Sequence, residues 1–285
     1  MHDEPIARTR RDLCPGALRP WPASDGALVR LRLAGGRLTS ESLAALSEVA
    51  TAHGDGNIHL TRRANVQLRG LPSRGGALPE SVLEAIEASG LLPSRSHELV
   101  RNFLASPMTG LAGGRCDVRP VVEVLDSLVC AHPDLAELPG RFLFVMDDGR
   151  GDLVDRPTDL GFVALDEQTV QLRIGSDGWG SVLPLGDAPQ ALVDLAAEFV
   201  RLRGEGPAAP WHVDEFAYPL ADPQTRDERT RVTCPPLPYG VNGPVVHVPA
   251  PGGVVSPGLA ADLVVRGPEL VVTPWHGILV DGGED

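Results

Sequence analysis

The stretch Ala27-Leu-Val-Arg-Leu-Arg-Leu33, followed by Ala34-Gly35-Gly36, carries the pattern that decides the fold. Apolar and polar side chains alternate along Ala27–Leu33, which predicts a strand with one buried face. The glycine pair predicts a turn directly after this strand, because glycine adopts backbone conformations that other residues avoid. A strand of this kind needs other elements to cover its apolar face, and the residues that follow supply them.

A helix and two further strands are predicted after the turn. Thr39 or Ser40 can cap the helix, and Glu41 suits its first turn. The apolar face of this helix is formed by Leu43, Leu46, Val49 and Ala50. Two strands are then expected at residues 58–61 and 66–71.

The C-terminal part of the chain repeats this order. An apolar strand is predicted at residues 245–248, Gly252-Gly253 repeat the glycine turn, and Ser256 opens a short helix. Two strands follow at 270–273 and 277–280. When the two copies are aligned, Gly26, Val29, Gly35, Gly36, Leu38 and Thr39 fall on Gly243, Val246, Gly252, Gly253, Val255 and Ser256. Because half-size units cannot each close a core, we expect both ends of the chain to form one composite domain.

The middle of the chain has a different pattern. Helices are predicted at residues 79–89, around Val121–Val129 and at 189–203, a buried strand at 141–146, and a hairpin from 162–165 and 169–174. Residues 204–243 are rich in Pro, Asp and Arg with weak periodicity, which is typical of a long linker or surface loop.

These elements predict an α+β protein. We expect two half-domains related by a pseudo-twofold repeat, together with a central α/β domain that has a mixed sheet. The expected boundaries are 1–93 for the first half-domain, 94–204 for the central domain, 205–235 for a linker and 236–285 for the second half-domain.

Composition excludes several classes of function. All 25 basic residues are arginine, and 38 acidic residues give a net charge of −13, so a general nucleic-acid binder is not expected. No stretch approaches the roughly 20 apolar residues of a membrane span, and the start of the chain does not resemble a secretory signal. The four cysteines are widely spaced, and no metal site is predicted from this chain alone. We therefore expect a cytoplasmic protein without membrane or nucleic-acid partners.

The first candidate site is the segment Thr61-Arg-Arg-Ala-Asn-Val-Gln67. It places Arg62 and Arg63 on a turn between two predicted strands. In an extended segment Arg63, Asn65 and Gln67 would share one face and offer a row of donors to an anionic ligand. The alternative is a solvated turn with ordinary surface arginines.

Two further segments offer cations near glycine-rich backbone. Arg101 and Asn102 precede an apolar run and a Gly-rich loop that ends in Arg115. Such a loop lets the backbone approach a ligand closely and present N–H groups to an anion. Arg141 follows Leu-Pro-Gly at the start of the predicted buried strand, where an ordinary strand-entry charge is the alternative.

Taken in order, these motifs resemble the sulfite/nitrite reductase superfamily. The resemblance rests on segments that begin at Cys14, Thr61, Val100, Leu138 and Leu270. It is strongest toward the precorrin-3B synthases, which are oxidoreductases of cobalamin biosynthesis. It implies ferredoxin-like half-domains, a tetrapyrrole (sirohaem or a precorrin substrate) and a [4Fe–4S] cluster. It also implies that Arg63, Arg101 and Arg141 contact tetrapyrrole carboxylates or a substrate oxyanion. No catalytic residue is assigned.

The sequence departs from the family at the cluster. The family's paired cysteines, spaced Cys-x5-Cys and Cys-x3-Cys, have no counterpart among Cys14, Cys116, Cys130 and Cys234. We therefore expect the N-terminal portion of such an oxidoreductase. The alternatives are a non-catalytic tetrapyrrole-binding subunit or carrier completed by a separate cysteine-bearing iron–sulfur chain, and a degenerate fragment without a ligand.

Overall fold

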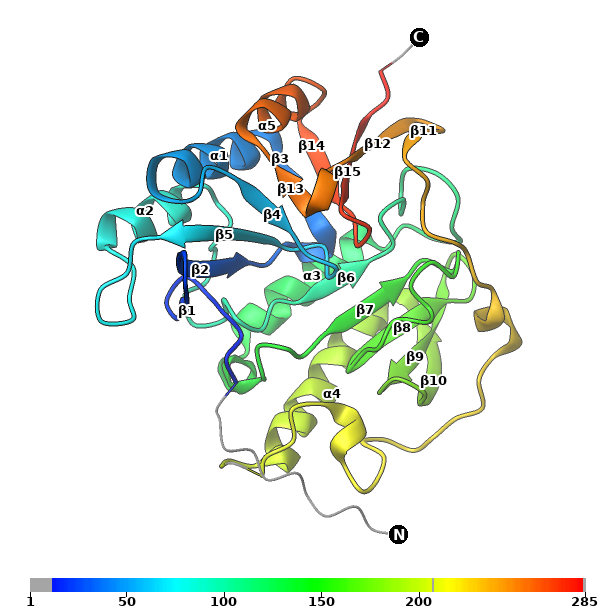
Figure 1. The fold of residues 1–285 in the computed structure, drawn as a ribbon. Helices are drawn as coiled ribbons and strands as arrows, with labels where there is room; N and C mark the ends of the chain where they lie inside the picture. Colours follow the sequence, from blue (N-terminus) through cyan, green and yellow to red (C-terminus); the bar gives the residue numbers. More distant parts are fainter. Residues whose placement is uncertain (1–11, 207, 284–285) are drawn as a thin grey trace.

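The computed structural model describes residues 12–206 and 208–283, so residues 1–11, 207 and 284–285 of the predicted units lie outside the described residues. The described chain contains three five-stranded sheets (Figure 1). Two of the sheets belong to the ends of the chain, and the third belongs to its middle. None of the helices in these ranges combines the length and apolar character needed to cross a membrane.

The first half-domain is built as the alternation predicts. It contains β1 (Trp21–Ala23), β2 (Gly26–Leu31), β3 (Arg37–Thr39), α1 (Ser40–His53), β4 (Ile58–Leu60), β5 (Val66–Leu71) and α2 (Glu80–Ala88). The Thr39 side chain caps α1 by accepting a hydrogen bond from the Ser42 backbone N–H. Leu43, Leu46 and Val49 of α1 are buried against the sheet.

The second half-domain repeats the first in order and detail. It contains β11 (Gly240–Asn242), β12 (Val245–Pro249), β13 (Val254–Val255), α5 (Pro257–Val264), β14 (Glu269–Val272) and β15 (Gly277–Asp281). Ser256 caps α5 as Thr39 caps α1. The glycine turns also match, since Gly35, Gly36, Gly252 and Gly253 all have φ values between 63° and 77°. The predicted internal repeat is confirmed.

The two half-domains exchange a strand. β3 leaves its own sheet and pairs with β14, while β13 pairs with β4, both antiparallel. The resulting sheet orders are β1-β2-β5-β4-β13 and β11-β12-β15-β14-β3. Because each sheet takes its last strand from the other copy, the ends of the chain form one composite domain with a shared core (Figure 1).

The central unit is an α/β domain with a mixed sheet, as predicted. Its strands are β6 (Phe103–Ala105), β7 (Phe144–Asp147), β8 (Leu160–Ala164), β9 (Thr169–Ile174) and β10 (Trp179–Pro184). β6, β7 and β8 run parallel, whereas β9 and β10 are antiparallel. The helices α3 (Arg119–Ala131) and α4 (Ala188–Arg203) contact each other and cover one face of this sheet (Figure 1). β7 begins three residues later than the strand expected from Arg141, because the Phe142 N–H is held in a turn by the Pro139 carbonyl.

The segment predicted as a linker lies along the central domain (Figure 1). It contains two short 3₁₀ turns, Val213–Glu215 and Glu228–Arg231. The Phe216 ring packs on Phe199 of α4 with 5.3 Å between ring centroids. The Gln171 side chain in β9 donates to the Thr225 carbonyl and accepts from the Asp227 N–H. The polar sequence is therefore fixed by specific bonds to the central sheet.

Close packing at the exchanged strand predicts the effect of a single methyl group. Gly36→Ala is expected to lower the free energy of unfolding by about 3 kcal/mol, because a left-handed backbone and overpacking both destabilise an alanine there. Its Cβ would lie 2.5 Å from the Val272 carbonyl oxygen. Gly252→Ala is the matched control, with φ of 65° and open space around its Cβ, and it should cost only about 1–2 kcal/mol. Equal losses in urea unfolding would contradict this packing.

Candidate anion-binding site

The turn between β4 and β5 is organised by the hydroxyl of Thr61. This oxygen accepts hydrogen bonds from the backbone N–H groups of Arg63 and Asn65, at 3.3 and 3.1 Å. Ala64 has a left-handed φ of 54°, which interrupts the alternation expected for an extended segment. Asn65 consequently points inward and is 1% exposed, so it does not share an open face with Arg63 and Gln67 as expected.

The turn brings Arg63 to the entrance of the central domain. Its Nη1 donates to the Arg141 carbonyl oxygen at 2.7 Å. The Arg141 side chain is exposed, and its guanidinium lies over the Trp211 ring, 5.7 Å from the ring centroid. Two of the arginines predicted from separate motifs are thus neighbours in the fold.

Arg30 joins this group from the neighbouring strand. It lies opposite Gln67 in the pairing of β2 with β5. With the Gln67 amide turned so that its oxygen faces the guanidinium, that oxygen accepts from Arg30 Nε and Nη2 at 3.0 and 2.7 Å. The alternation of residues 27–33 already placed Arg30 on a polar face, but its pairing with Gln67 depends on the strand register.

Arg62 and Arg156 extend the group. Arg62 is exposed at the tip of the turn. Burial lowers the pKa of Arg156, and the nearby positive charge of Arg62 lowers it further. No sequence motif pointed to Arg156, which comes from the loop after β7. We call Arg30, Arg62, Arg63, Arg141 and Arg156 the basic cluster.

The guanidinium groups of the basic cluster are not directly paired with carboxylates in the described part of the chain. Across residues 12–206 and 208–283, none of its members forms an ion pair with a carboxylate. Burial lowers the pKa of Arg63, as do the charges of Arg30 and Arg141. Guanidinium groups nevertheless stay protonated in proteins. A partly buried group of like charges is stabilised when an anion binds, because the anion relieves their mutual repulsion.

Asp159 is a buried acidic side chain beside Arg63 of the basic cluster. Asp159 is 1% exposed and accepts hydrogen bonds from the N–H groups of Leu143 and Val213. Burial raises the pKa of Asp159 to about 6, against the opposing effect of His212, whose Nε2 is 3.6 Å away. This carboxyl group therefore changes its charge close to neutral pH.

The two predicted asparagines fix the half-domain to the central domain. The Asn65 Oδ1 accepts from the Leu33 N–H, and its Nδ2 donates to the Asn102 Oδ1 at 3.3 Å. Asn102 in turn donates to the Gly140 and Leu99 carbonyls. Both amides are 1% exposed. Both side chains form their hydrogen bonds within the protein interior, so they support the turn that carries the basic cluster.

Two other predicted cations, Arg101 and Arg115, also form hydrogen bonds with groups of the protein itself. Arg101 is 6% exposed, and its Nε and Nη2 bind the Asp126 carboxylate of α3 at 2.6 and 2.5 Å. Burial lowers the pKa of Arg101, but the bond to Asp126 outweighs this effect and the pKa is raised. Arg115 donates to the Ala164 carbonyl at the C-terminal end of β8. The structure thus brings Arg62, Arg63 and Arg141 together and directs Arg101 toward α3.

A group of carboxylates lies at the end of β7. Asp147, Asp148 and Asp152 offer oxygens within 4.8 Å of one another. Asp147 accepts from three backbone N–H groups, Arg150 pairs with Asp148, and the Ser106 hydroxyl donates to Asp152. Burial raises the pKa of Asp152 to about 7, and the charge of Asp147 adds to this effect. Since these bonds already engage all three carboxylates, we assign no ligand to them.

Comparisons with known proteins show that part of the chain is similar to nitrite and sulfite reductases. Residues 22–74 match the family described as the nitrite/sulfite reductase ferredoxin-like half domain. This confirms the resemblance inferred from the motifs. The match covers β1 to β5, the part of the first half-domain that carries Arg30, Arg62 and Arg63.

Curated relatives include two ferredoxin–nitrite reductases. That of Leptolyngbya laminosa is 32% identical over 151 residues, 50% of this chain and 29% of the relative. That of Synechococcus elongatus is 33% identical over 163 residues, 54% of this chain and 31% of the relative. A precorrin-3B synthase of a Sinorhizobium species is 42% identical over 66 residues, 23% of this chain and 14% of the relative. Each match spans less than a third of its relative's length.

A solved structure shares the fold over most of the chain. The NirA protein of Mycobacterium tuberculosis superposes with a TM-score of 0.64 at 17% identity. The superposition covers 89% of this chain and 53% of NirA. The α+β architecture with half-domains and a mixed central sheet is therefore confirmed.

The Arg101–Asp126 pair predicts a loss of stability when it is broken. Arg101→Leu is expected to lower the free energy of unfolding by about 3 kcal/mol, because it leaves the Asp126 charge partly buried without a partner. Arg95→Leu, which breaks an exposed pair with Glu87, is the control and should change stability little. Urea unfolding measures both variants. An unchanged unfolding midpoint for Arg101→Leu would contradict the structural role of this pair.

The raised pKa of Asp152 predicts a pH-dependent stability. Between about pH 4 and about pH 7 the unfolded chain ionises this group while the folded protein keeps it protonated, so ionisation destabilises the fold as the pH rises. The free energy of unfolding of Asp152→Asn should therefore increase relative to that of wild type as the pH rises through this range. The total change should be on the order of 3 kcal/mol. Urea unfolding at several pH values measures the difference, with the exposed Asp134→Asn as control. A difference that is constant with pH would refute the assignment.

Proposed function

Because the chain carries a nitrite/sulfite reductase ferredoxin-like half domain, we propose that its basic cluster binds the carboxylates of a tetrapyrrole. The protein would then act in an oxidoreductase of the precorrin-3B synthase or nitrite/sulfite reductase type, in tetrapyrrole metabolism. The observation that carries this proposal is the gathering of five arginines without carboxylate partners in the described chain. We further propose a cytoplasmic location, where its four free thiols stay reduced.

The residues of the basic cluster fit the periphery of sirohaem or a precorrin. Both molecules carry acetate and propionate groups around the ring, and a guanidinium fork binds a carboxylate through two parallel hydrogen bonds. Arg62 and Arg141 are exposed and able to reach outward, while Arg63 is held by the Arg141 carbonyl. A planar ligand with carboxylates on several sides would meet cations from both the half-domain and the central domain.

In this proposal the chain orients the ligand and places a titratable carboxyl group near it. When bound, the tetrapyrrole or its iron supplies the redox chemistry. Arg30, Arg63 and Arg141 would fix the ring through its carboxylates and neutralise their charge. Asp159, whose pKa burial raises to about 6, lies close to Arg63 and exchanges a proton with solvent or ligand as the pH passes through that value.

A [4Fe–4S] cluster does not fit the cysteines of this chain. Cys14, Cys116, Cys130 and Cys234 are free thiols, and within the described residues no cysteine joins a group of three ligand atoms. This observation favours the second candidate function, a non-catalytic tetrapyrrole-binding subunit or carrier that a cysteine-bearing chain completes. Iron and sulfide analysis of the purified protein distinguishes the two, because a stoichiometric cluster would exclude the carrier.

The proposed function predicts tight and charge-dependent binding of sirohaem. Changing Arg62, Arg63 and Arg141 together to Gln should weaken binding by about 100-fold or more, since each charge-assisted hydrogen bond contributes about 1.5–3 kcal/mol. Absorbance titration of the full chain measures the dissociation constant. The affinity should also fall with added salt.

The control triple variant changes Arg74, Arg201 and Arg266 to Gln. These arginines are exposed and lie on other parts of the fold, so the variant has the same net charge but an intact basic cluster. It should bind sirohaem like wild type. Absence of saturable binding by wild type, or equal weakening in both variants, would refute the proposed function.

A further inference from the structure

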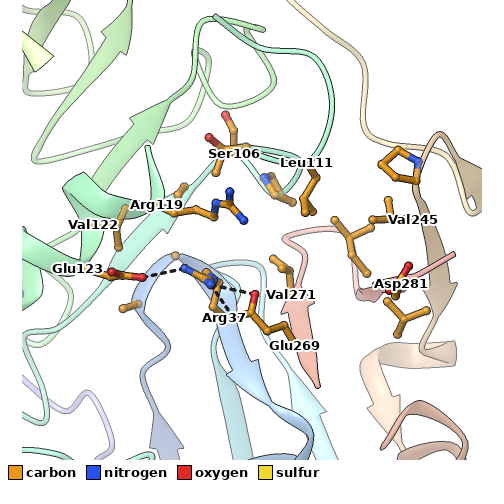
Figure 2. Close-up of a pocket in the computed structure, with 18 of the residues that line it drawn as sticks. Arg37, Ser106, Leu111, Arg119, Val122, Glu123, Val245, Glu269, Val271 and Asp281 are labelled. Atoms are coloured by element: carbon orange, nitrogen blue, oxygen red, sulfur yellow. Dashed lines mark hydrogen bonds and ion pairs between the residues drawn. The ribbon is translucent and has the colours of Figure 1, made fainter. Parts of the chain in front are cut away.

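A cavity lies away from the basic cluster, at the junction of all three structural units. Its volume is about 370 Å³, within the range of small-molecule sites. Figure 2 shows side chains converging on it from β3, from α3 and the segment after β6, and from β12, β14 and β15. No member of the basic cluster lines this cavity. It is therefore a separate site and does not rest on the proposed function.

The floor of the cavity is the outer face of the second half-domain's sheet. Arg37, Val271 and Leu279 lie side by side across β3, β14 and β15. Val245 lies opposite Asp281 in the pairing of β12 with β15. The alternate residues of these strands, such as Val272 and Val280, face the other way into the core. The floor is thus an apolar strip, in which Val245 and Leu279 are buried with Met108 and Val271 is only partly buried.

The opposite wall comes from the central domain. Val122 of α3 and Leu111 of the loop after β6 contribute apolar side chains (Figure 2). Leu111 is 37% exposed and marks the open side. An apolar molecule in the cavity would remove from water the apolar surface that Val271 and Leu111 still expose, which favours binding by about 25 cal/mol per Å².

Charges at the rim favour a cation. Arg37 already pairs with Glu123 and Glu269 at 2.9 and 3.0 Å. Arg119 pairs with Asp117 and donates to the Gly110 carbonyl. These pairs neutralise both guanidiniums of the lining.

Asp281 has no such partner. Its carboxylate accepts a hydrogen bond only from the Gly283 N–H, and in the described part of the chain no arginine or histidine pairs with it. It lies at the edge of the apolar strip, beside Val245 (Figure 2). The charge left over at the rim is therefore negative.

We propose that this cavity binds a small apolar molecule that carries one protonated amine. The apolar body would lie against Val271 and Leu111, and the ammonium group would meet Asp281. An anionic tetrapyrrole is unsuited to this cavity because its carboxylates would face the same acidic rim. Because three units line the cavity, the ligand would also stabilise their arrangement by mass action.

Three naphthalene probes of similar size test the charge preference. 1-Naphthylmethylamine is a cation, 1-naphthylmethanol is neutral and 1-naphthylacetate is an anion at neutral pH. In calorimetric titrations of the full chain we expect the amine to bind at least about 10-fold more tightly than the alcohol, which equals about 1.4 kcal/mol. The acetate should bind most weakly. Equal affinities, tightest binding of the acetate, or absence of saturable binding of the amine would refute the proposal.

Two variants test the location. Asp281→Asn should abolish the preference for amine over alcohol, whereas Asp262→Asn, an exposed carboxylate change on α5, should leave it intact. Leu111→Trp fills the cavity from its open side and should weaken binding of all three probes. Leu202→Trp places the same side chain on an exposed position of α4 and should not. Urea unfolding checks that each variant is folded. An unchanged preference in Asp281→Asn, or unchanged binding in folded Leu111→Trp, would overturn the assignment.

Discussion

The reciprocal exchange of β3 and β13 is the constraint on which the rest of the structure depends. Each half-domain sheet takes its last strand from the other copy, so neither copy can complete its sheet alone. Each exchanged strand follows a turn at a glycine pair, Gly35-Gly36 before β3 and Gly252-Gly253 before β13. At Gly36 the turn lies against the Val272 carbonyl. The same short turn packs on β6 and α3 of the central domain, with the ideal Cβ of Gly35 3.4 Å from Ala105. One pair of glycines therefore fixes how all three units meet.

The two copies share a scaffold but differ in chemistry. Arg30 faces Gln67 in the first sheet, and His247 faces Leu279 at the same register in the second. His247 is fully buried, and its Nε2 and the Thr273 hydroxyl are 3.0 Å apart. Burial lowers the pKa of His247, so this ring stays neutral. The first copy consequently presents cations at the boundary with the central domain, whereas the second presents an apolar strip that becomes the floor of the further cavity.

The arginines of the chain differ in function because their surroundings differ. Arg101 is buried and pairs with a carboxylate, so its charge is neutralised within the protein. Arg63 lies at a domain boundary and meets only a carbonyl oxygen there. The same guanidinium group thus stabilises the fold in one place and leaves charge available to a ligand in another. Asn65 and Asn102 show the same division, because both resemble ligand-binding amides in the sequence and both hold domains together in the fold.

The sequence by itself determined the repeat, the α+β class, most helices and strands, and the turn that carries Arg62 and Arg63, because these features depend on local periodicity, glycine turns and helix caps. Only the tertiary structure decided which strands are exchanged, where Arg101 points, and that Arg30 and Arg156 join Arg63 and Arg141. The physical reason is that periodicity assigns a residue to a face of its own element, whereas the partner of a charge is set by contacts between elements far apart in the chain. The apolar cavity follows the same rule, since each of its walls comes from a different part of the sequence.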